Sequence, residues 1–207
     1  MTDLIRPYRP DDLEAVQRIC VQTGDAGRDA TGQHDDPREL TDRWATPYLQ
    51  LEPTHAVVAE RDGAVVGYVL GTADTRRFAA RFEAGEWIGP AGSALDHTER
   101  SDHARHMLIP ECDAFPAHLH IDILEQGRGG GLGRRLVQHF VDTLPAHTGV
   151  HVVVDPGNPG ALSFYPRVGF ERVRTGPDGV VFALSPERPT APTTELPARG
   201  SPATGVR

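Results

Sequence analysis

The segment RGGGLG, residues 128–133, constrains the fold of this chain most strongly. It lies between a run of alternating apolar residues and a segment whose apolar residues recur at helical spacing. We therefore predict a strand, a glycine loop and a helix, in that order. Glycine lets the backbone approach a bulky anion without an intervening Cβ. Free N–H groups and the positive end of a helix dipole then meet at one point, which indicates a phosphate or pyrophosphate site.

Two common nucleotide loops do not fit this segment. A P-loop requires lysine in GxxxxGK[ST], and all 21 basic residues of the chain are arginine. The dinucleotide pattern GxGxxG fails in every register, because its sixth position never falls on glycine. The pattern that fits is R-x-x-G-x-G, with Arg128, Gly131 and Gly133. A second register, which starts at Gln126 and continues through Gly129, has the same spacing.

A second motif follows a β-branched run at residues 150–155. It is NPGALSFYPRVGF, residues 158–170. Together with the glycine loop, it resembles the GNAT superfamily of N-acetyltransferases, whose members carry a similar N-x-x-A-x-x-x-Y-x-x-x-G-F after their fifth strand. The positions in register are Asn158, Ala161, Tyr165, Gly169 and Phe170. The opening IRPYRPDDLEAVQRIC is similar to the family's first strand and helix, so the resemblance spans about residues 1–184.

A smaller branch of the family is also similar. The segments TGDAGRDATG, LHIDIL and FYPRVGF resemble bacterial proteins related to the acetyltransferase-like domain of O-GlcNAcase. The eukaryotic member of that branch resembles a pseudo-enzyme. Here the glycine loop is intact, which favours binding of CoA.

The resemblance implies an α/β (α+β) fold, with a mixed central sheet of about six or seven strands flanked by helices. A V-shaped cofactor cleft would lie between the fourth and fifth strands. Periodicity and turn signals predict strands at residues 4–6, 55–60, 64–72, 115–124, 150–155, 170–174 and 180–184. They predict a first helix that Asp11 or Asp12 caps and that carries its apolar residues from Leu13 to Cys20. Further helices are predicted at residues 38–48, 133–144 and 159–165. Pro166 should end or bend the last of these near Tyr165.

One domain, residues 1–184, is expected. Within it, residues 74–116 form an inserted segment, in which RRFAARFEAGEW and TERSDHARHML have helical character. Residues 185–207 carry five prolines and no aromatic residue, which predicts a disordered tail.

Charge and composition narrow the class of protein. A net charge of −8 argues against a general nucleic-acid partner and is compatible with a cationic amine substrate. No apolar run approaches the length of a membrane helix, and the start MTDL is no signal peptide. Two cysteines give no disulfide framework. These features predict a cytoplasmic protein with no membrane partner, monomeric or homodimeric.

The resemblance implies acetyl-CoA as co-substrate and no metal. A backbone N–H near the end of the fourth strand would polarise the thioester carbonyl. The residues expected to contact CoA are Ile123, Leu124, Arg128, Gly129, Gly130, Gly131, Gly133, Arg134 and Asn158.

The catalytic candidates follow from the chemistry of acyl transfer. An alkylammonium with a pKa of about 10.4 must lose a proton before it can attack. The strand AHLHIDIL places His118, His120 and Asp122 on one face, where a polar row requires a cleft or hydrogen bonds. Asp122 is the first candidate for the base and His120 the second, although either could instead satisfy buried polar groups. The resemblance implies that Tyr165 protonates the departing thiolate.

The function predicted is transfer of an acetyl group to a primary amine by direct attack in a ternary complex. The acceptor would be a small molecule or a peptide. Its site would lie between the loop of residues 23–36, with Asp25, and the inserted segment, with Trp87. Two alternatives stay open. One is a non-catalytic acyl-CoA-binding module, and the other is a metal-dependent hydrolase that uses the H-x-H-x-D of HLHID.

Overall fold

A seven-stranded sheet forms the centre of the computed structural model, which describes residues 3–177 and 179–186. The strand order is β1-β2-β3-β4-β5-β7-β6. The strands are β1 Leu4–Pro7, β2 Val57–Arg61, β3 Ala64–Thr72, β4 Ala117–Ile123, β5 Val150–Val154, β6 Glu171–Gly176 and β7 Gly179–Leu184. Neighbouring strands are antiparallel except β4 and β5, which are parallel. The mixed sheet predicted from the sequence is thus confirmed.

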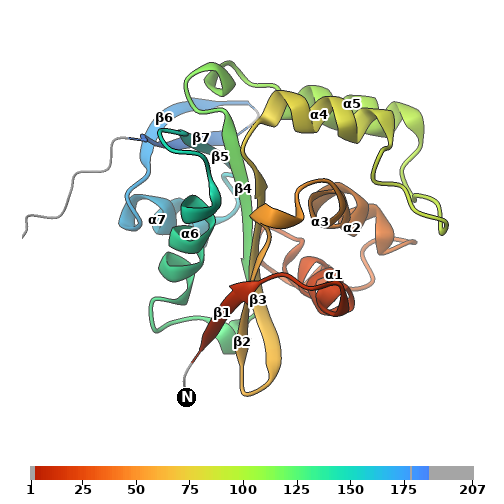
Figure 1. Cartoon of the computed structure of the whole chain (residues 1–207), viewed down its shortest axis with the longest axis horizontal. Helices are drawn as coiled ribbons and strands as arrows, with labels where there is room; N and C mark the ends of the chain where they lie inside the picture. The colour runs from red at the N-terminus through yellow and green to blue at the C-terminus, as the bar shows by residue number, and fades with distance from the viewer. Residues whose placement is uncertain (1–2, 178, 187–207) are drawn as a thin grey trace, which may run out of the picture.

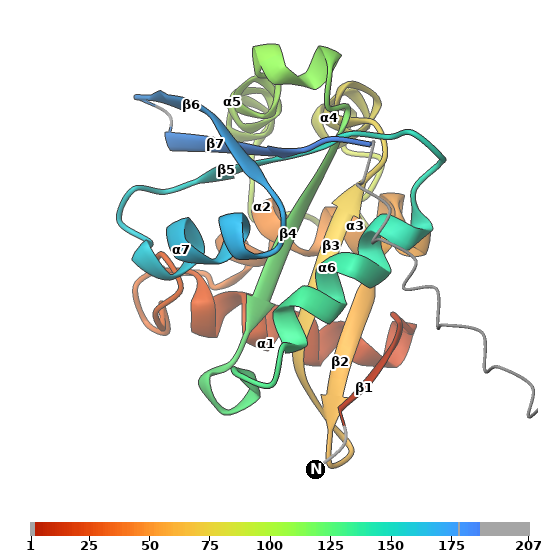
Figure 2. The ribbon, with the colours of Figure 1, turned by 90° about the vertical axis from the view of Figure 1, so that its left-hand side faces the viewer.

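Helices cover both faces of the sheet (Figure 1). The α-helices are α1 Leu13–Thr23, α2 Arg38–Trp44, α3 Thr46–Leu51, α4 Thr75–Ala84, α5 His97–Met107, α6 Leu132–Thr143 and α7 Pro159–Arg167. Helix α6 crosses one face of β2, β3 and β4, while α1 lies behind the sheet in the same view (Figure 2).

Two apolar clusters lie on the two faces of the sheet. Strand β3 contributes to both, because successive side chains of a strand point to opposite faces. Tyr68 and Leu70 pack with α1, α3 and α4, whereas Val69 packs with α6, β5 and β7. Gly71 lies directly under α6. A Cβ at this position would be 2.5 Å from the ring of Phe140, so the close approach of β3 and α6 requires glycine.

The helix predicted at residues 38–48 is two helices in the structure. Helix α2 ends at Trp44, and Ala45 has φ −133° and ψ −65° before α3 begins at Thr46. The break is explained by Pro47, which has no N–H to donate to the carbonyl of Arg43 in a continuous helix. The last helix ends near Tyr165, as predicted, since α7 includes Pro166 and ends at Arg167.

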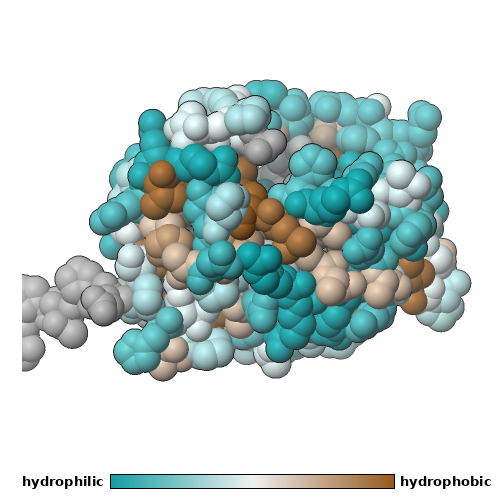
Figure 3. All heavy atoms as spheres, turned by 90° about the horizontal axis from the view of Figure 1, so that it is seen from above, coloured by the Kyte–Doolittle hydropathy of each residue, from teal (hydrophilic) through white to brown (hydrophobic). Residues whose placement is uncertain are grey.

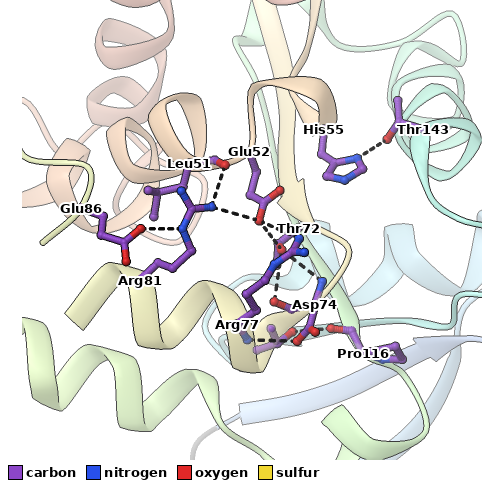
Figure 4. Close-up of polar contacts among 11 residues, drawn as sticks. Leu51, Glu52, His55, Thr72, Asp74, Arg77, Arg81, Glu86, Pro116 and Thr143 are labelled. Atoms are coloured by element: carbon purple, nitrogen blue, oxygen red, sulfur yellow. Dashed lines mark hydrogen bonds and ion pairs between the residues drawn. The ribbon is translucent and has the colours of Figure 1, made fainter. Parts of the chain in front are cut away.

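The segment between β3 and β4 forms α4 and α5, which pack on each other above the sheet (Figure 1). The face seen from above, over these helices, is mainly hydrophilic (Figure 3). A buried carboxylate joins this segment to the rest of the protein. Glu52 accepts from Thr72 Oγ1 (3.4 Å) and from Arg77 (3.2 Å), while Arg81 donates to the Leu51 carbonyl (3.2 Å; Figure 4).

Residues 187–207, most of the predicted tail, lie outside the described residues. Within the part of the chain that is described, no helix is both long and apolar enough to cross a membrane.

Candidate active site

Strands β4 and β5 separate soon after they meet. Among the described residues they pair only at Ala117 with Val150 and at His118 with His151. From His120 to Ile123, β4 is partly exposed on its way to the glycine loop. This divergence opens the sheet in its middle, between the fourth and fifth strands.

A cavity of about 840 Å³ occupies the opening. Its walls are the end of β4, the glycine loop, the first turns of α6, helix α7 and the loop after α1. The residues predicted from the sequence that line it are Asp122, Ile123, Arg128, Gly129, Gly131, Gly133, Arg134, Asn158 and Tyr165. The structure therefore brings together residues from three distant parts of the chain.

The glycine loop has the geometry of an anion site. Gly131 is the N-cap residue of α6 with φ 73°, a left-handed conformation that non-glycine residues rarely adopt. The amides of the first turn of α6 have no partner within the helix, and Gly133 and Arg134 of that turn line the cavity. Four arginines also line it, namely Arg28, Arg128, Arg134 and Arg167. The dipole of α6 and the arginine side chains thus favour binding of a polyanion at this end of the cavity.

Arg128 connects the glycine loop to two other walls. Its Nε donates to the carbonyl of Ile123 (3.2 Å), and its guanidinium also donates to the carbonyl of Gly27 (3.0 Å). Gly27 in turn lies against the side chain of Asn158. The loop after α1 therefore forms part of the same cavity. Sequence reasoning placed this loop only in the acceptor site, and Gly27 and Arg28 were missed although the glycine-bearing TGDAG segment was a signal.

The backbone of β4 points a hydrogen-bond donor toward the cavity. Leu124 N–H donates to Val66 of β3 (2.9 Å), whereas Ala117 N–H donates to Gly149 on the β5 side (3.1 Å). Successive residues of a strand direct their N–H groups to alternate neighbours, so Ile123 shares the orientation of Ala117. Its N–H points toward the diverged β5. A donor in this position can polarise a carbonyl bound in the cleft.

Asp122 and Tyr165 provide the titratable groups of the cavity. The hydroxyl of Tyr68 donates to the Asp122 carboxylate (2.7 Å), and burial raises the pKa of Asp122. Burial, with Asp122 nearby, also raises the pKa of Tyr165, whose ring stacks on Phe182. Tyr165 therefore keeps its proton at neutral pH, and the pKa of Asp122 moves toward the range of an effective base.

Five of the predicted site residues do not line this cavity. His120 faces Tyr48 and Trp44, and Gly130 lies in the loop but outside the lining. Leu124 is buried in the cluster on the α1 side. Asp25 pairs with Arg28 at the surface (3.0 Å).

Trp87 belongs to the core. It is 4% exposed, it stacks on Phe82, and its indole N–H donates to the Phe82 carbonyl (3.1 Å). The acceptor wall expected at Trp87 is therefore not formed by this residue.

The histidines of the H-x-H-x-D segment have a protein partner in the structure. Within the described ranges, no three His, Cys, Asp or Glu side chains are grouped as metal ligands. The hydroxyl of Tyr48 lies between His118 and His120, at 2.7 Å and 3.0 Å from their Nε2 atoms. The two imidazoles are thus partners of a phenol.

The fold and the cleft are those of the acetyltransferase class. The Acetyltransferase (GNAT) family matches residues 25–170, and the chain belongs to this family.

Relatives lie among both known sequences and solved structures. The chain is 26% identical over 180 residues to Protein O-GlcNAcase of Rattus norvegicus and, equally, to that of Mus musculus. The match covers 80% of this chain but 20% of those proteins, so the chain spans about a fifth of their length. The crystal structure of SsHAT is similar with 38% identity and a TM-score of 0.76, over 91% of this chain and 100% of that one.

A structure of yncA from Salmonella typhimurium shares the fold. Its TM-score is 0.51 at 15% identity, over 94% of this chain and 99% of that one, and it was solved with its cofactor acetyl-CoA.

Proposed function

We propose that this protein is an acetyl-CoA-dependent N-acetyltransferase that moves an acetyl group to a primary amine by direct attack in a ternary complex. The observation that carries the proposal is the shared cavity, in which Asp122 and Tyr165 lie with the glycine loop and four arginines. Family membership supports the use of acetyl-CoA.

Each of three residues of the cavity has its own role in the proposed reaction. Asp122 accepts the proton of the acceptor ammonium, so that the amine lone pair can attack the thioester carbonyl. The N–H of Ile123 stabilises the oxyanion that forms on the carbonyl oxygen. When the carbon–sulfur bond breaks, the Tyr165 hydroxyl donates its proton to the departing thiolate, and the second proton that the attacking nitrogen loses as it becomes an amide restores the phenol. Burial raises the pKa of each group, which makes the Asp122 carboxylate a stronger base and keeps the Tyr165 hydroxyl protonated until the thiolate departs.

The experiment is a comparison of three proteins with acetyl-CoA and a panel of primary amines. Thiol release reports transfer, and calorimetry reports binding of CoA. We expect Tyr165→Phe to lower kcat by about 10²–10⁴-fold with little change in CoA affinity. Tyr8→Phe is the matched control, because Tyr8 packs beside the cluster on the α1 side and does not line the cavity. Tight CoA binding without transfer to any amine would instead indicate a non-catalytic acyl-CoA-binding module.

A further inference from the structure

A continuous chain of hydrogen bonds runs along the α1-side face of β4, next to the proposed active site. Thr75 Oγ1 lies 2.7 Å from the Pro116 carbonyl and 2.8 Å from His118 Nδ1. The Tyr48 hydroxyl lies 2.7 Å from His118 Nε2 and 3.0 Å from His120 Nε2. These contacts join β4 to α3 and to the start of α4.

The direction of the first two bonds is fixed by chemistry. A carbonyl has no proton, so the Thr75 hydroxyl must donate at the short contact with Pro116. Its single proton is then used, and Thr75 must accept from the N–H at His118 Nδ1. His118 is buried, and burial places its pKa well below the usual value, so the ring is neutral and carries one N–H. His118 Nε2 is therefore an acceptor.

The same reasoning extends to His120. The Tyr48 hydroxyl donates to His118 Nε2, and burial raises the pKa of this phenol, so it keeps its proton. The Tyr48 oxygen is left to accept from an N–H at His120 Nε2. Burial lowers the pKa of His120 to about 4, so this ring is also neutral. Its remaining nitrogen, Nδ1, then carries an unprotonated lone pair.

His120 is partly exposed, and it has an aromatic ring, a second histidine and a carboxylate as neighbours. Trp44, 38% exposed, lies edge-on between His120 and His103, with ring centroids 5.2 Å and 4.7 Å away. His103 is 9% exposed, and its Nε2 has no hydrogen-bond partner among the described residues. Asp122 follows His120 on the same face of β4, about 7 Å along the strand, and lines the cavity.

We propose that Thr75, His118 and Tyr48 are positioning residues that hold His120 in the Nε2–H tautomer, so that its Nδ1 accepts a hydrogen bond from the amino group of the acyl acceptor. The acceptor is then a primary amine held between His120 and Asp122, with its alkyl part against Trp44. The identity of this ligand as an acyl acceptor rests on the proposed function. The tautomer and the amine contact do not.

Long-range ¹⁵N–¹H NMR of the histidine rings tests the tautomer in the full chain without any substrate. We expect His120, assigned by loss of its signals in His120→Gln, to carry its proton on Nε2. Thr75→Val, a nearly isosteric change remote from His120, and Tyr48→Phe should each convert His120 into a tautomer mixture. Circular dichroism verifies that both variants are folded. A proton on Nδ1 in the wild-type protein, or an unchanged tautomer in folded Thr75→Val and Tyr48→Phe, overturns the proposal.

A second arm uses butylamine and phenethylamine as probes. Addition of either amine should shift the His120 Nδ1 resonance, and no shift at saturating amine overturns the amine contact. In kinetic assays, Thr75→Val should raise the KM for amine by roughly tenfold, with kcat changed by less than about threefold and the Kd for acetyl-CoA unchanged. His139→Gln, an exposed change on α6, is the control. If the wild-type protein transfers no acetyl group, the proposed function fails while the NMR arm still decides this inference.

Discussion

Tyr68 donates its phenolic proton to Asp122 from the directly opposite position of the neighbouring strand, at 2.7 Å. The phenol is buried and the carboxylate is partly buried, and burial raises the pKa of each. This hydrogen bond therefore affects the pH at which the proposed base, Asp122, takes up a proton. The hydrogen bond lowers the pKa of Asp122 and opposes the larger effect of burial.

Replacement of the base should remove most of the activity. We expect Asp122→Asn to lower kcat by about 10²–10⁴-fold, because the asparagine amide cannot accept a proton. In the wild-type protein the rate should fall as the pH drops through the pKa of Asp122, since only the ionised carboxylate is a base. The pH profile of kcat/KM measures this limb.

Tyr68→Phe should change the pKa of Asp122 without moving its carboxylate. Loss of the phenolic donor raises the pKa of Asp122 further, so the acidic limb should move to higher pH while the rate on the plateau is largely retained. A pH profile identical to that of the wild-type protein would contradict a role for Asp122 as the base.

The left-handed conformation of Gly131 should contribute to cofactor binding. A Cβ at Gly131 would meet no atom within 4 Å, so alanine is opposed only by its backbone conformation, at about 1–2 kcal/mol. We expect Gly131→Ala to weaken acetyl-CoA binding about tenfold in calorimetry, because the loop must shift. Gly63→Ala is a matched control, since Gly63 has φ 81° and equally open space in the β2–β3 turn. It should leave the Kd unchanged.

The protein should become less stable when the pH falls below about 6.5, the ordinary pKa of a histidine side chain. Burial lowers the pKa of His103 to about 3 and that of His120 to about 4, and His118 is lowered as well. The unfolded chain binds protons from about pH 6.5 downward and the folded chain does not. The stabilising contribution of these histidines is therefore fully present above about pH 6.5, and it is lost as the pH falls to about 4 for His120 and to about 3 for His103. Each such histidine contributes a slope of about 1.4 kcal/mol per pH unit.

Urea unfolding at pH 7.5, 6.5 and 5.5 measures that slope. His103→Phe should lower this slope by the contribution of one histidine, because it removes one titrating group. The change loses no hydrogen bond of Nε2, since this atom has no partner among the described residues. A free energy of unfolding that is constant over this range would show that the histidines take up protons in the folded protein at the same pH as in the unfolded chain.

The carboxylate of Glu52 should stabilise the attachment of α4. Its side chain is 7% exposed and lies between Thr72 and Arg77, which come from β3 and α4 (Figure 4). Glu52→Gln removes a buried charge from two hydrogen bonds and should cost about 1–3 kcal/mol in urea unfolding. The surface pair of Arg76 and Asp113 is the comparison, and Arg76→Gln should cost less than about 1 kcal/mol. Equal losses would assign no special role to Glu52.

The sequence was sufficient for features that depend on local pattern. Alternation and turn signals located all seven strands, and the glycine loop and the 158–170 motif located the cavity through Arg128 and Tyr165. The break at Ala45 was missed because it depends on a single absent N–H, that of Pro47. Trp87 could not be placed, because an aromatic residue in an inserted segment packs where tertiary contacts allow, here on Phe82. The partners of His118 lie 43 and 70 residues away along the chain, beyond any local pattern.

The two pairs that join β4 to β5 have a thermodynamic consequence. The sheet has two halves, β1 to β4 and β5 to β7. Few backbone hydrogen bonds join these halves, because β4 and β5 pair at only two positions among the described residues. A molecule bound in the cleft contacts both halves where strand pairing is absent. Its binding free energy then stabilises the folded sheet, and the melting temperature rises with ligand concentration. In this protein, the cofactor and the fold would stabilise each other.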